Sequence, residues 1–309
     1  MNLCAFEDEL KDENKIEIRE LLKAERFEKL MFHVRDTKSN MRLLYAMASS
    51  PRWRNIKIGN FVEKLCAQSE EQFAAITVYL DDDHACAVFR GTDATLVGWK
   101  EDFNMSFIMP VPSQEAAVEY INSTCQYIRG RLYIGGHSKG GNLAIYSAVK
   151  CSERVRKKID CVYNNDGPGF DVNMIKSAKY QAMLPLIKSI VPENSIVGML
   201  LEHDEDYIIV KSSQSGLMQH DAMSWQVLGA FLVKAKKLSA QSRRLNKALS
   251  SWINSDDNER REEFVETLFG LLYASGAKNL SDVSTNRSEE HTSELQSHHD
   301  LVCRLLHEK

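Results

Sequence analysis

The residues best suited to chemistry lie in one glycine-rich turn near the middle of the chain. Residues 136–140 read G-x-S-x-G with Ser138 at the centre, an apolar run precedes them, and a helical pattern of apolar residues follows. A serine on such a strand-to-helix turn projects its hydroxyl beyond the sheet, beside the amide donors that begin the helix. We therefore predict that Ser138 is a nucleophile. A phosphate-binding loop is excluded because Asn142 and Leu143 stand where that motif requires lysine and then serine or threonine.

A serine hydroxyl reacts well only when a neutral imidazole accepts its proton and a carboxylate orients that imidazole. With this type of turn, the serine comes first in the chain, the acid second and the histidine last. Two histidines, His203 and His220, lie between Ser138 and the C-terminal tail. We predict His220 as the base because it lies in a loop after the last apolar β run. His137, on the turn itself, is predicted to be structural.

The acid is expected just past the strand that precedes the histidine. We interpret Ser195–Leu201 as that strand, and a cluster of carboxylates follows it. Asp206 is favoured because an apolar pair follows it directly, and Asp204 is the alternative. A fallback combines the same serine with Asp166 and His203, although the sequence D-G-P-G at Asp166 is also typical of a tight turn.

An oxyanion that forms on the substrate needs two hydrogen-bond donors already in place. The amide of Lys139, the residue after the nucleophile, is predicted to be one. The other is predicted at the end of an earlier strand, where Thr92 offers both an amide and a hydroxyl. The alternative interpretation is that Arg90–Asp93 is an ordinary polar strand end.

Several motifs in combination resemble a known family. The chain is similar to an uncharacterised bacterial family of lipase-like α/β-hydrolases, which is itself similar to the class 3, fungal-type triacylglycerol lipases. The resemblance covers roughly residues 40–235, and its motifs are specific in combination. The motifs that carry it are FRGTD (89–93), WKED (99–102), GHSKGGNLA (136–144), DGPGF (166–170), VGMLLEHDEDY (197–207) and QHD (219–221).

The resemblance implies a triad made of the serine and histidine named above and an aspartate after a strand. It also implies that Thr92 lies in the oxyanion hole and that Trp99 and Asp102 match the pair that supports the lid and the hole in the lipases. The sequence departs from the lipase pattern at two places. Lys139 replaces the usual leucine after the nucleophile, and the D-x-V-P that follows the acid in those enzymes is not present.

Alternating strand and helix patterns predict an α/β fold with a mainly parallel sheet and helices on both faces. The predicted strands are 73–79, 85–90, 132–134, 158–164, 195–201 and 207–210. The predicted helices after residue 110 are 114–128, 172–190, 224–238, 241–253 and 259–274. Asp81–Asp83 is predicted to be a solvated hairpin tip rather than a metal site, because turns favour aspartate and ligand spacing is missing.

Composition limits the classes of function. The chain has 309 residues and a net charge of −4, so it shows no basic footprint for nucleic acid. No stretch approaches the roughly 18 apolar residues of a membrane span, and the N-terminus lacks a signal-peptide pattern. Seven scattered cysteines favour reduced thiols over a disulfide framework. We expect a cytoplasmic protein with no nucleic-acid partner, cofactor or metal, and with transient contact to a membrane surface left open.

Three parts are predicted along the chain: an N-terminal helical segment over residues 1–40, an α/β-hydrolase domain with C-terminal helices over 41–286, and a non-native tail over 287–309. The tail resembles an in-frame translation of a sequencing adapter and is predicted to carry no site. Within the domain, the stretch from Asp93 to Pro112 is unusually apolar for a connection. It is predicted either to cover Ser138 as a lid or to pack in the core.

The predicted function is that of a serine hydrolase that cleaves a carboxylic ester or thioester, of a small molecule or a lipid, through an acyl-enzyme on Ser138. Two alternatives stay open. One is a non-catalytic scaffold or binding protein that keeps the turn as architecture, because fold alone does not give function. The other is an acyltransferase with the same triad.

Overall fold

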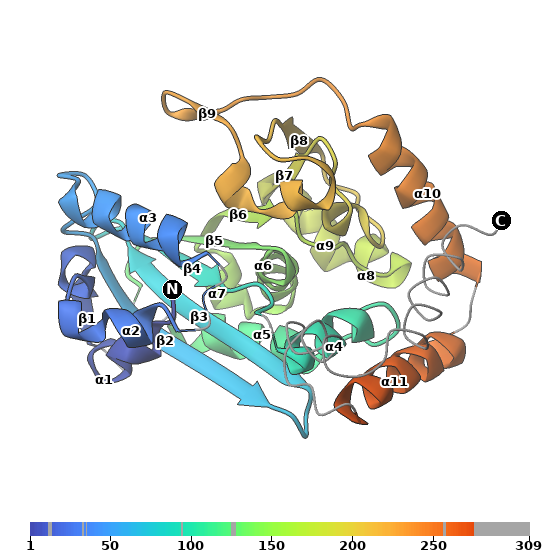
Figure 1. Ribbon diagram of the computed structural model, residues 1–309, viewed down its shortest axis with the longest axis horizontal. Helices are drawn as coiled ribbons and strands as arrows, with labels where there is room; N and C mark the ends of the chain where they lie inside the picture. The colour runs from blue at the N-terminus through green and yellow to red at the C-terminus, as the bar shows by residue number, and fades with distance from the viewer. Residues whose placement is uncertain are drawn as a thin grey trace, which may run out of the picture.

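A computed structural model describes residues 1–11, 14–32, 34, 36–93, 95–124, 128–255 and 258–274. Within these residues the chain forms one eight-stranded sheet, in which every strand lies beside its neighbour in the sequence (Figure 1). The first four strands pair antiparallel, and the fourth to the eighth pair parallel. The strands are β1 (Lys15–Glu17), β2 (Lys57–Cys66), β3 (Glu71–Tyr79), β4 (His84–Phe89), β5 (Arg131–His137), β6 (Ile159–Asn165), β7 (Ile187–Pro192) and β8 (Tyr207–Val210).

The residues of β3 show how the sheet separates two cores. Successive side chains of a strand point to opposite faces. Phe73 and Ala75 belong to the main hydrophobic core, whereas Ile76 and Val78 pack against a second cluster built from the N-terminal part of the chain. The strand is therefore covered on both faces, which explains its nearly continuous apolar sequence.

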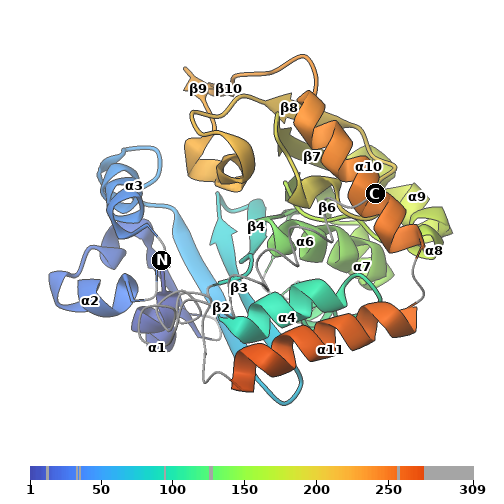
Figure 2. The ribbon, with the colours of Figure 1, turned by 45° about the vertical axis from the view of Figure 1, so that its right-hand side comes forward.

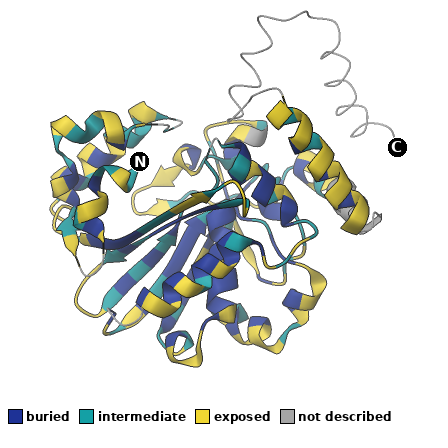
Figure 3. Cartoon of the chain, turned by 90° about the horizontal axis from the view of Figure 1, so that it is seen from below, coloured by how far each residue is buried: buried dark blue, intermediate teal, exposed yellow. Residues whose placement is uncertain are grey.

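Helices cover one face of the parallel half of the sheet. Right-handed crossovers between strands that are neighbours in order place their helices on the same side. These helices are α5 (Pro112–Thr124), α6 (Lys139–Lys150), α7 (Glu153–Arg156), α8 (Val172–Lys176) and α9 (Ala178–Met183). Their buried apolar residues fill the main core together with the strands, while exposed residues line the outward sides of the helices (Figure 3).

The N-terminal residues cover the opposite face of β2 and β3 (Figure 1). Their longer elements are α1 (Glu7–Leu10), α2 (Phe27–Leu30) and α3 (Thr37–Ser49). The same segment also supplies β1, which pairs with β2 and so extends the central sheet. The boundary predicted at residue 40 stays a prediction.

Two helices end the described chain, α10 (Ala240–Ser255) and α11 (Asn258–Ala274). The second of them lies along α4 (Leu96–Asn104), as Figure 2 shows. Leu96, Val265 and Phe269 form a small separate core between the two helices. The C-terminal helix thereby fixes the segment that connects β4 to α5.

The structure differs from two sequence predictions in ways that matter for the site. The helix predicted over 172–190 ends at Met183, and β7 begins at Ile187, because Pro185 cannot continue a helix. Ser195–Leu201, predicted as a strand, is instead a connection with a short 3₁₀ helix, η6 (Val197–Met199). The strand that precedes this connection is therefore β7.

A third difference lies after His220. The helix predicted over 224–238 is absent from this described stretch, which holds a 3₁₀ helix η8 (Ala222–Ser224) and a hairpin of β9 (Val227–Leu228) and β10 (Phe231–Leu232). Gly229 adopts a φ of +63° in the turn, a conformation that favours glycine. The helices predicted over 241–253 and 259–274 are confirmed as α10 and α11. The tail over 287–309 lies outside the described residues.

Candidate active site

Ser138 stands at a sharp turn between β5 and α6. It has a φ of 59° and a ψ of −131°, and it is the residue directly before the first turn of α6. Such backbone strain in a non-glycine residue is typical of functional positions. Gly136 and Gly140 make the turn possible, because a Cβ on Gly136 would lie 2.3 Å from the carbonyl carbon of Gly140. The G-x-S-x-G spacing thus reflects direct contact between the two glycines.

His220 is paired with a carboxylate that follows a different strand from the one expected. Its Nδ1 lies 2.7 Å from Oδ2 of Asp166, directly after β6. The Asp166 side chain is fully buried, and about a fifth of the His220 side chain is exposed. The imidazole can donate from Nδ1 to the carboxylate, which leaves Nε2 as the atom able to accept a proton.

A dedicated pocket holds the Asp166 carboxylate. Its Oδ1 accepts a hydrogen bond from the Ser195 hydroxyl, and its backbone N–H donates to the Ile190 carbonyl at 2.8 Å. A Cβ on Gly198 would lie 2.2 Å from Oδ1, so only glycine leaves room for the carboxylate. Sequence reasoning missed Ser195 and Gly198, because both fall in the stretch that was predicted to be a strand.

The predicted acids lie elsewhere. Asp206 is exposed, and Asp204 accepts a hydrogen bond from Nε2 of Gln181 at 2.7 Å. The structure therefore places Asp166, and neither Asp206 nor its alternative Asp204, against His220. The strand before this connection lies at Ile187–Pro192 (β7) rather than at residues 195–201, and the carboxylate that reaches His220 follows β6, one strand earlier.

The fallback histidine belongs to a separate buried cluster. His203 lies 3.1 Å from Oε1 of Glu205, which also accepts from Ser189, while Oε2 accepts from the Tyr180 hydroxyl at 2.7 Å. Burial alone would raise the pKa of Glu205, but the hydrogen bond and charge of His203, with the two hydroxyl donors, hold it at about 2. This cluster joins α9, β7 and the loop before β8.

His137 connects the nucleophile turn to the loop that carries His220. Its Nε2 donates to the His220 carbonyl at 2.6 Å, and the two imidazole rings lie 4.6 Å apart. Burial lowers the pKa of His137, and the neighbouring His220 lowers it further. The neutral ring thus holds His220 close to the residue that precedes Ser138.

Thr92 lies at the other side of the turn. A Cβ on Gly91 would come within 3.2 Å of the Ser138 Cβ, so the end of β4 and Ser138 are in close contact. The Thr92 hydroxyl donates to Oδ2 of Asp102 at 2.5 Å. Burial raises the pKa of Asp102 from 3.8 to about 6. Trp99, on the same helix, is 37% exposed.

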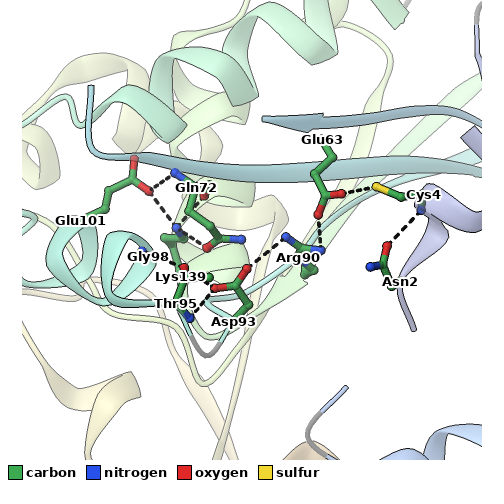
Figure 4. A network of polar contacts seen from close by, with 10 residues as sticks. All are labelled: Asn2, Cys4, Glu63, Gln72, Arg90, Asp93, Thr95, Gly98, Glu101 and Lys139. Carbon is green, nitrogen blue, oxygen red and sulfur yellow. Dashed lines mark hydrogen bonds and ion pairs between the residues drawn. The ribbon is translucent and has the colours of Figure 1, made fainter. Parts of the chain in front are cut away.

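Lys139 turns its side chain away from this surface. Its ammonium lies 2.8 Å from Oε2 of Glu101 and from Oε1 of Gln72, and 2.6 Å from the Gln72 carbonyl (Figure 4). Glu101 also accepts from the backbone N–H of Ser113 at 2.8 Å. The backbone N–H of Lys139, in the first turn of α6, is among those that a helix leaves unused.

A cavity of about 310 Å³ lies next to the turn, on the side of α6. Asn142, one helical turn beyond Ser138, is among its lining residues, and Ser138 is not. The rest of the lining is mixed: apolar side chains such as Met105, Phe107, Ile108, Phe170 and Leu201 share it with polar and charged ones that include Asp171, Glu202 and Arg261. In the segment predicted as either lid or core, Phe107 packs against the small core between α4 and α11, and Ile108 is 41% exposed. The lid role stays a prediction.

Two features are absent from the residues that the structure describes. Among them, no group of three or more histidine, cysteine, aspartate or glutamate side chains is arranged to hold a metal ion. No helix of the described chain combines the length and the apolar character that crossing a membrane requires.

A family model for Mbeg1-like proteins matches residues 47–270, which include every residue of the site. The chain belongs to the Mbeg1-like family. The sheet with its parallel half, the helices on both faces and the strand–turn–helix at Ser138 give this Mbeg1-like protein an α/β-hydrolase fold. No curated protein sequence matches the chain.

Several solved lipase structures are similar to this Mbeg1-like chain, each with a TM-score of 0.40. The Rhizomucor miehei lipase in its propeptide complex is 18% identical, over 61% of this chain and 69% of that chain. A fungal lipase–inhibitor complex is 15% identical, over 62% and 82%. M37 lipase is 12% identical, over 57% and 70%.

Proposed function

We propose that this Mbeg1-like protein is a serine hydrolase that cleaves a carboxylic ester or thioester through an acyl-enzyme on Ser138. The observation that carries the proposal is the 2.7 Å pair of His220 and the buried Asp166, next to a strained serine on a strand-to-helix turn. Ser138 is half-buried, and a histidine oriented by a carboxylate near a serine is the arrangement that activates a hydroxyl.

In the proposed reaction, the Ser138 oxygen attacks the carbonyl carbon while Nε2 of His220 takes the hydroxyl proton. Asp166 keeps the imidazole in the tautomer with its Nδ1 proton and stabilises the imidazolium. The imidazolium then gives its proton to the leaving alcohol or thiol. Water, deprotonated by Nε2, releases the acid and restores the serine.

The amides of Lys139 and Thr92 are the proposed donors to the oxyanion. The Thr92 hydroxyl is already committed to Asp102, so we assign it to holding the loop rather than to the substrate. A preorganised donor of this kind is worth roughly a hundredfold to a thousandfold in rate. The cavity beside Asn142 is the proposed binding site for an acyl group, because apolar side chains such as Ile108 and Phe170 line part of it. The proposed substrate is therefore a small-molecule or lipid ester in the cytoplasm.

A fluorophosphonate probe tests the proposal, because it labels only an activated serine. We expect labelling of the wild type at Ser138, mapped by peptide mass spectrometry, and none of Ser138→Ala. Ser106→Ala, which changes another serine beside the cavity, is the matched control and should be labelled like the wild type. A wild-type protein that is folded but not labelled would favour the non-catalytic scaffold.

Hydrolysis is then measured on p-nitrophenyl esters of different acyl length. We expect Ser138→Ala to lose on the order of a million-fold in kcat, because the triad residues act as a unit. Transfer of the acyl group to an added alcohol, in excess over hydrolysis, would identify an acyltransferase instead.

A further inference from the structure

The β9–β10 hairpin carries apolar side chains into solvent. Val227, Leu228 and Phe231 are 63%, 77% and 78% exposed. They stand within five residues of one another, at the end of the hairpin beyond β8 (Figure 2). Contiguous exposed apolar surface rimmed by polar residues marks an interaction site on a soluble protein.

The base of the hairpin is firmly anchored, so its tip is held away from the body of the protein. Lys211, which follows β8, donates its N–H to the Val233 carbonyl at 2.9 Å and accepts from the Gln226 N–H at 2.8 Å. Trp225 is buried, and its indole N–H donates to the Gln219 carbonyl at 2.9 Å. The exposed side chains at the tip are therefore carried by a hairpin whose base is held by hydrogen bonds.

The loop that carries His220 also exposes apolar side chains. Met218 and Met223 flank His220 in the sequence and are 56% and 50% exposed. Ser224, next to Met223, bonds to the Ser212 hydroxyl at 2.7 Å and so joins this loop to the strand that holds the hairpin. We call these five side chains, Val227, Leu228, Phe231, Met218 and Met223, the apolar tip.

The segment that carries the apolar tip is rich in lysine. Residues 207–240 contain four lysines, at 211, 234, 236 and 237, and one carboxylate, that of Asp221. All four lysines are exposed, and no ion pair joins any of them to a carboxylate in the described part of the chain. The chain as a whole is negative, with a net charge of −4, so this cluster is a local feature.

We propose that the apolar tip and its lysines dock this protein on an anionic lipid surface. Leucine, phenylalanine and methionine side chains enter the boundary between headgroups and acyl chains, and lysines beside them remain with the anionic headgroups. Docking in this way brings His220 and the serine turn to the lipid surface. The inference is independent of the proposed chemistry, because it concerns attachment and not turnover.

The test is flotation of the full-length protein with vesicles of phosphatidylcholine alone and with vesicles that also contain phosphatidylglycerol. We expect binding to the anionic vesicles that weakens as salt rises. The double variant Leu228→Ser with Phe231→Ser should bind about tenfold more weakly, because it removes the two most exposed apolar anchors. Its matched control is Leu65→Ser with Leu271→Ser, which changes two similarly exposed leucines on β2 and α11 and should bind like the wild type.

The contribution of the lysine charges to vesicle binding is tested with a triple variant that combines Lys234→Gln, Lys236→Gln and Lys237→Gln. We expect this triple variant to lose about tenfold in binding to anionic vesicles and nothing on neutral ones. Changing Lys157, Lys176 and Lys179 to glutamine, three exposed lysines elsewhere, is the control for net charge.

Three results would overturn the proposal. The first is a folded wild type that does not float with anionic vesicles, and the second is equal binding by the hairpin variant and its leucine control. The third is a wild-type dimer, seen by sedimentation velocity, that the hairpin variant dissociates without any change in vesicle binding. Such a dimer would assign the apolar tip to a second copy of the chain. Circular dichroism of each variant confirms that it is folded.

Discussion

The ammonium of Lys139 lies 2.8 Å from the Glu101 carboxylate, and both side chains are excluded from solvent directly beneath the proposed nucleophile. The pair joins α6 to α4, and Gln72 of β3 completes it (Figure 4). A lysine at this position therefore does not make the entrance to the site polar. It ties the first turn of α6, which supplies a proposed oxyanion donor, to the helix that carries Asp102.

The first prediction concerns this buried pair. Lys139→Met leaves the Glu101 carboxylate buried without its cation, and we expect a loss of about 3–5 kcal/mol in the free energy of unfolding. Adding Glu101→Gln should recover part of that loss, because the remaining group is then neutral. Urea unfolding of both single variants and the double variant measures the coupling.

A surface ion pair provides the control. Arg131 and Asp160 lie 2.7 Å apart, and their side chains are 63% and 36% exposed. Arg131→Met should cost less than about 1 kcal/mol, because water screens the charges and the long side chain regains freedom. If Lys139→Met is no more costly than Arg131→Met, the buried pair does not hold the turn in place.

The second prediction separates the two candidate acids. Asp166→Asn should lower kcat by roughly ten-thousandfold, because the amide favours the wrong imidazole tautomer while the fold is kept. Asp206→Asn should change kcat by less than about twofold, since that carboxylate is exposed and follows a different strand. Steady-state hydrolysis of a p-nitrophenyl ester by the two variants measures this. If Asp206→Asn lowers kcat more than Asp166→Asn does, Asp206 is the carboxylate that orients His220.

Local patterns predicted the elements that define the site but not the pairing between them. The serine turn, the hairpin of β3 and β4, and β8 follow from short-range signals that lie within a few residues of each other. The partner of His220 depends on which connection folds against it, and the strand expected at residues 195–201 lies at Ile187–Pro192 instead, while the paired carboxylate follows β6. β7 was missed because I-K-S-I-V-P also fits the end of a helical pattern.

The direction of a side chain is likewise decided by distant residues. Ser195 and Gly198 surround Asp166 only after the connection that follows β7 folds back over β6. Lys139 points inward because Glu101 and Gln72, from elements far apart in the sequence, meet beneath it. No spacing within the sequence signals either contact, since each joins residues nearly 30 or more positions apart.

The third prediction concerns pH and Asp102. Burial raises its pKa from 3.8 to about 6, so the folded protein binds this proton more tightly than the unfolded chain does. Between about pH 4 and pH 6 the folded state therefore holds more protons, and the free energy of unfolding falls as the pH rises. Asp102→Asn removes this dependence, so relative to the wild type it should gain about 2 kcal/mol from pH 4 to pH 7.

Urea unfolding at several pH values measures that difference. The control is Asp82→Asn, which changes an exposed carboxylate at the tip of the β3–β4 hairpin and should follow the wild-type profile. A constant difference between Asp102→Asn and the wild type over this range would mean that the carboxylate beside Thr92 is not kept from water in solution.

The fourth prediction separates the two roles of the segment before α5. Phe107 packs against the small core between α4 and α11, whereas Ile108 is exposed and lines the cavity. Phe107→Ser should lower the free energy of unfolding by about 2 kcal/mol, since a partly buried aromatic ring is lost. Ile108→Ser should cost less than about 0.5 kcal/mol.

Changes at Ile108 and Phe107 should also differ in their effect on ester hydrolysis. Ile108→Trp places a larger side chain at the cavity and should lower kcat/KM for long acyl esters about tenfold, with little change for the acetate, because only a long chain needs that space. Phe107 also lines the cavity, but Phe107→Ser enlarges it, so this variant should not lower kcat/KM for long esters relative to the acetate in whatever fraction stays folded. A p-nitrophenyl ester series from acetate to a long acyl chain, measured for both variants, gives the comparison. If Ile108→Trp lowers every ester equally, the cavity beside Asn142 does not bind the acyl group.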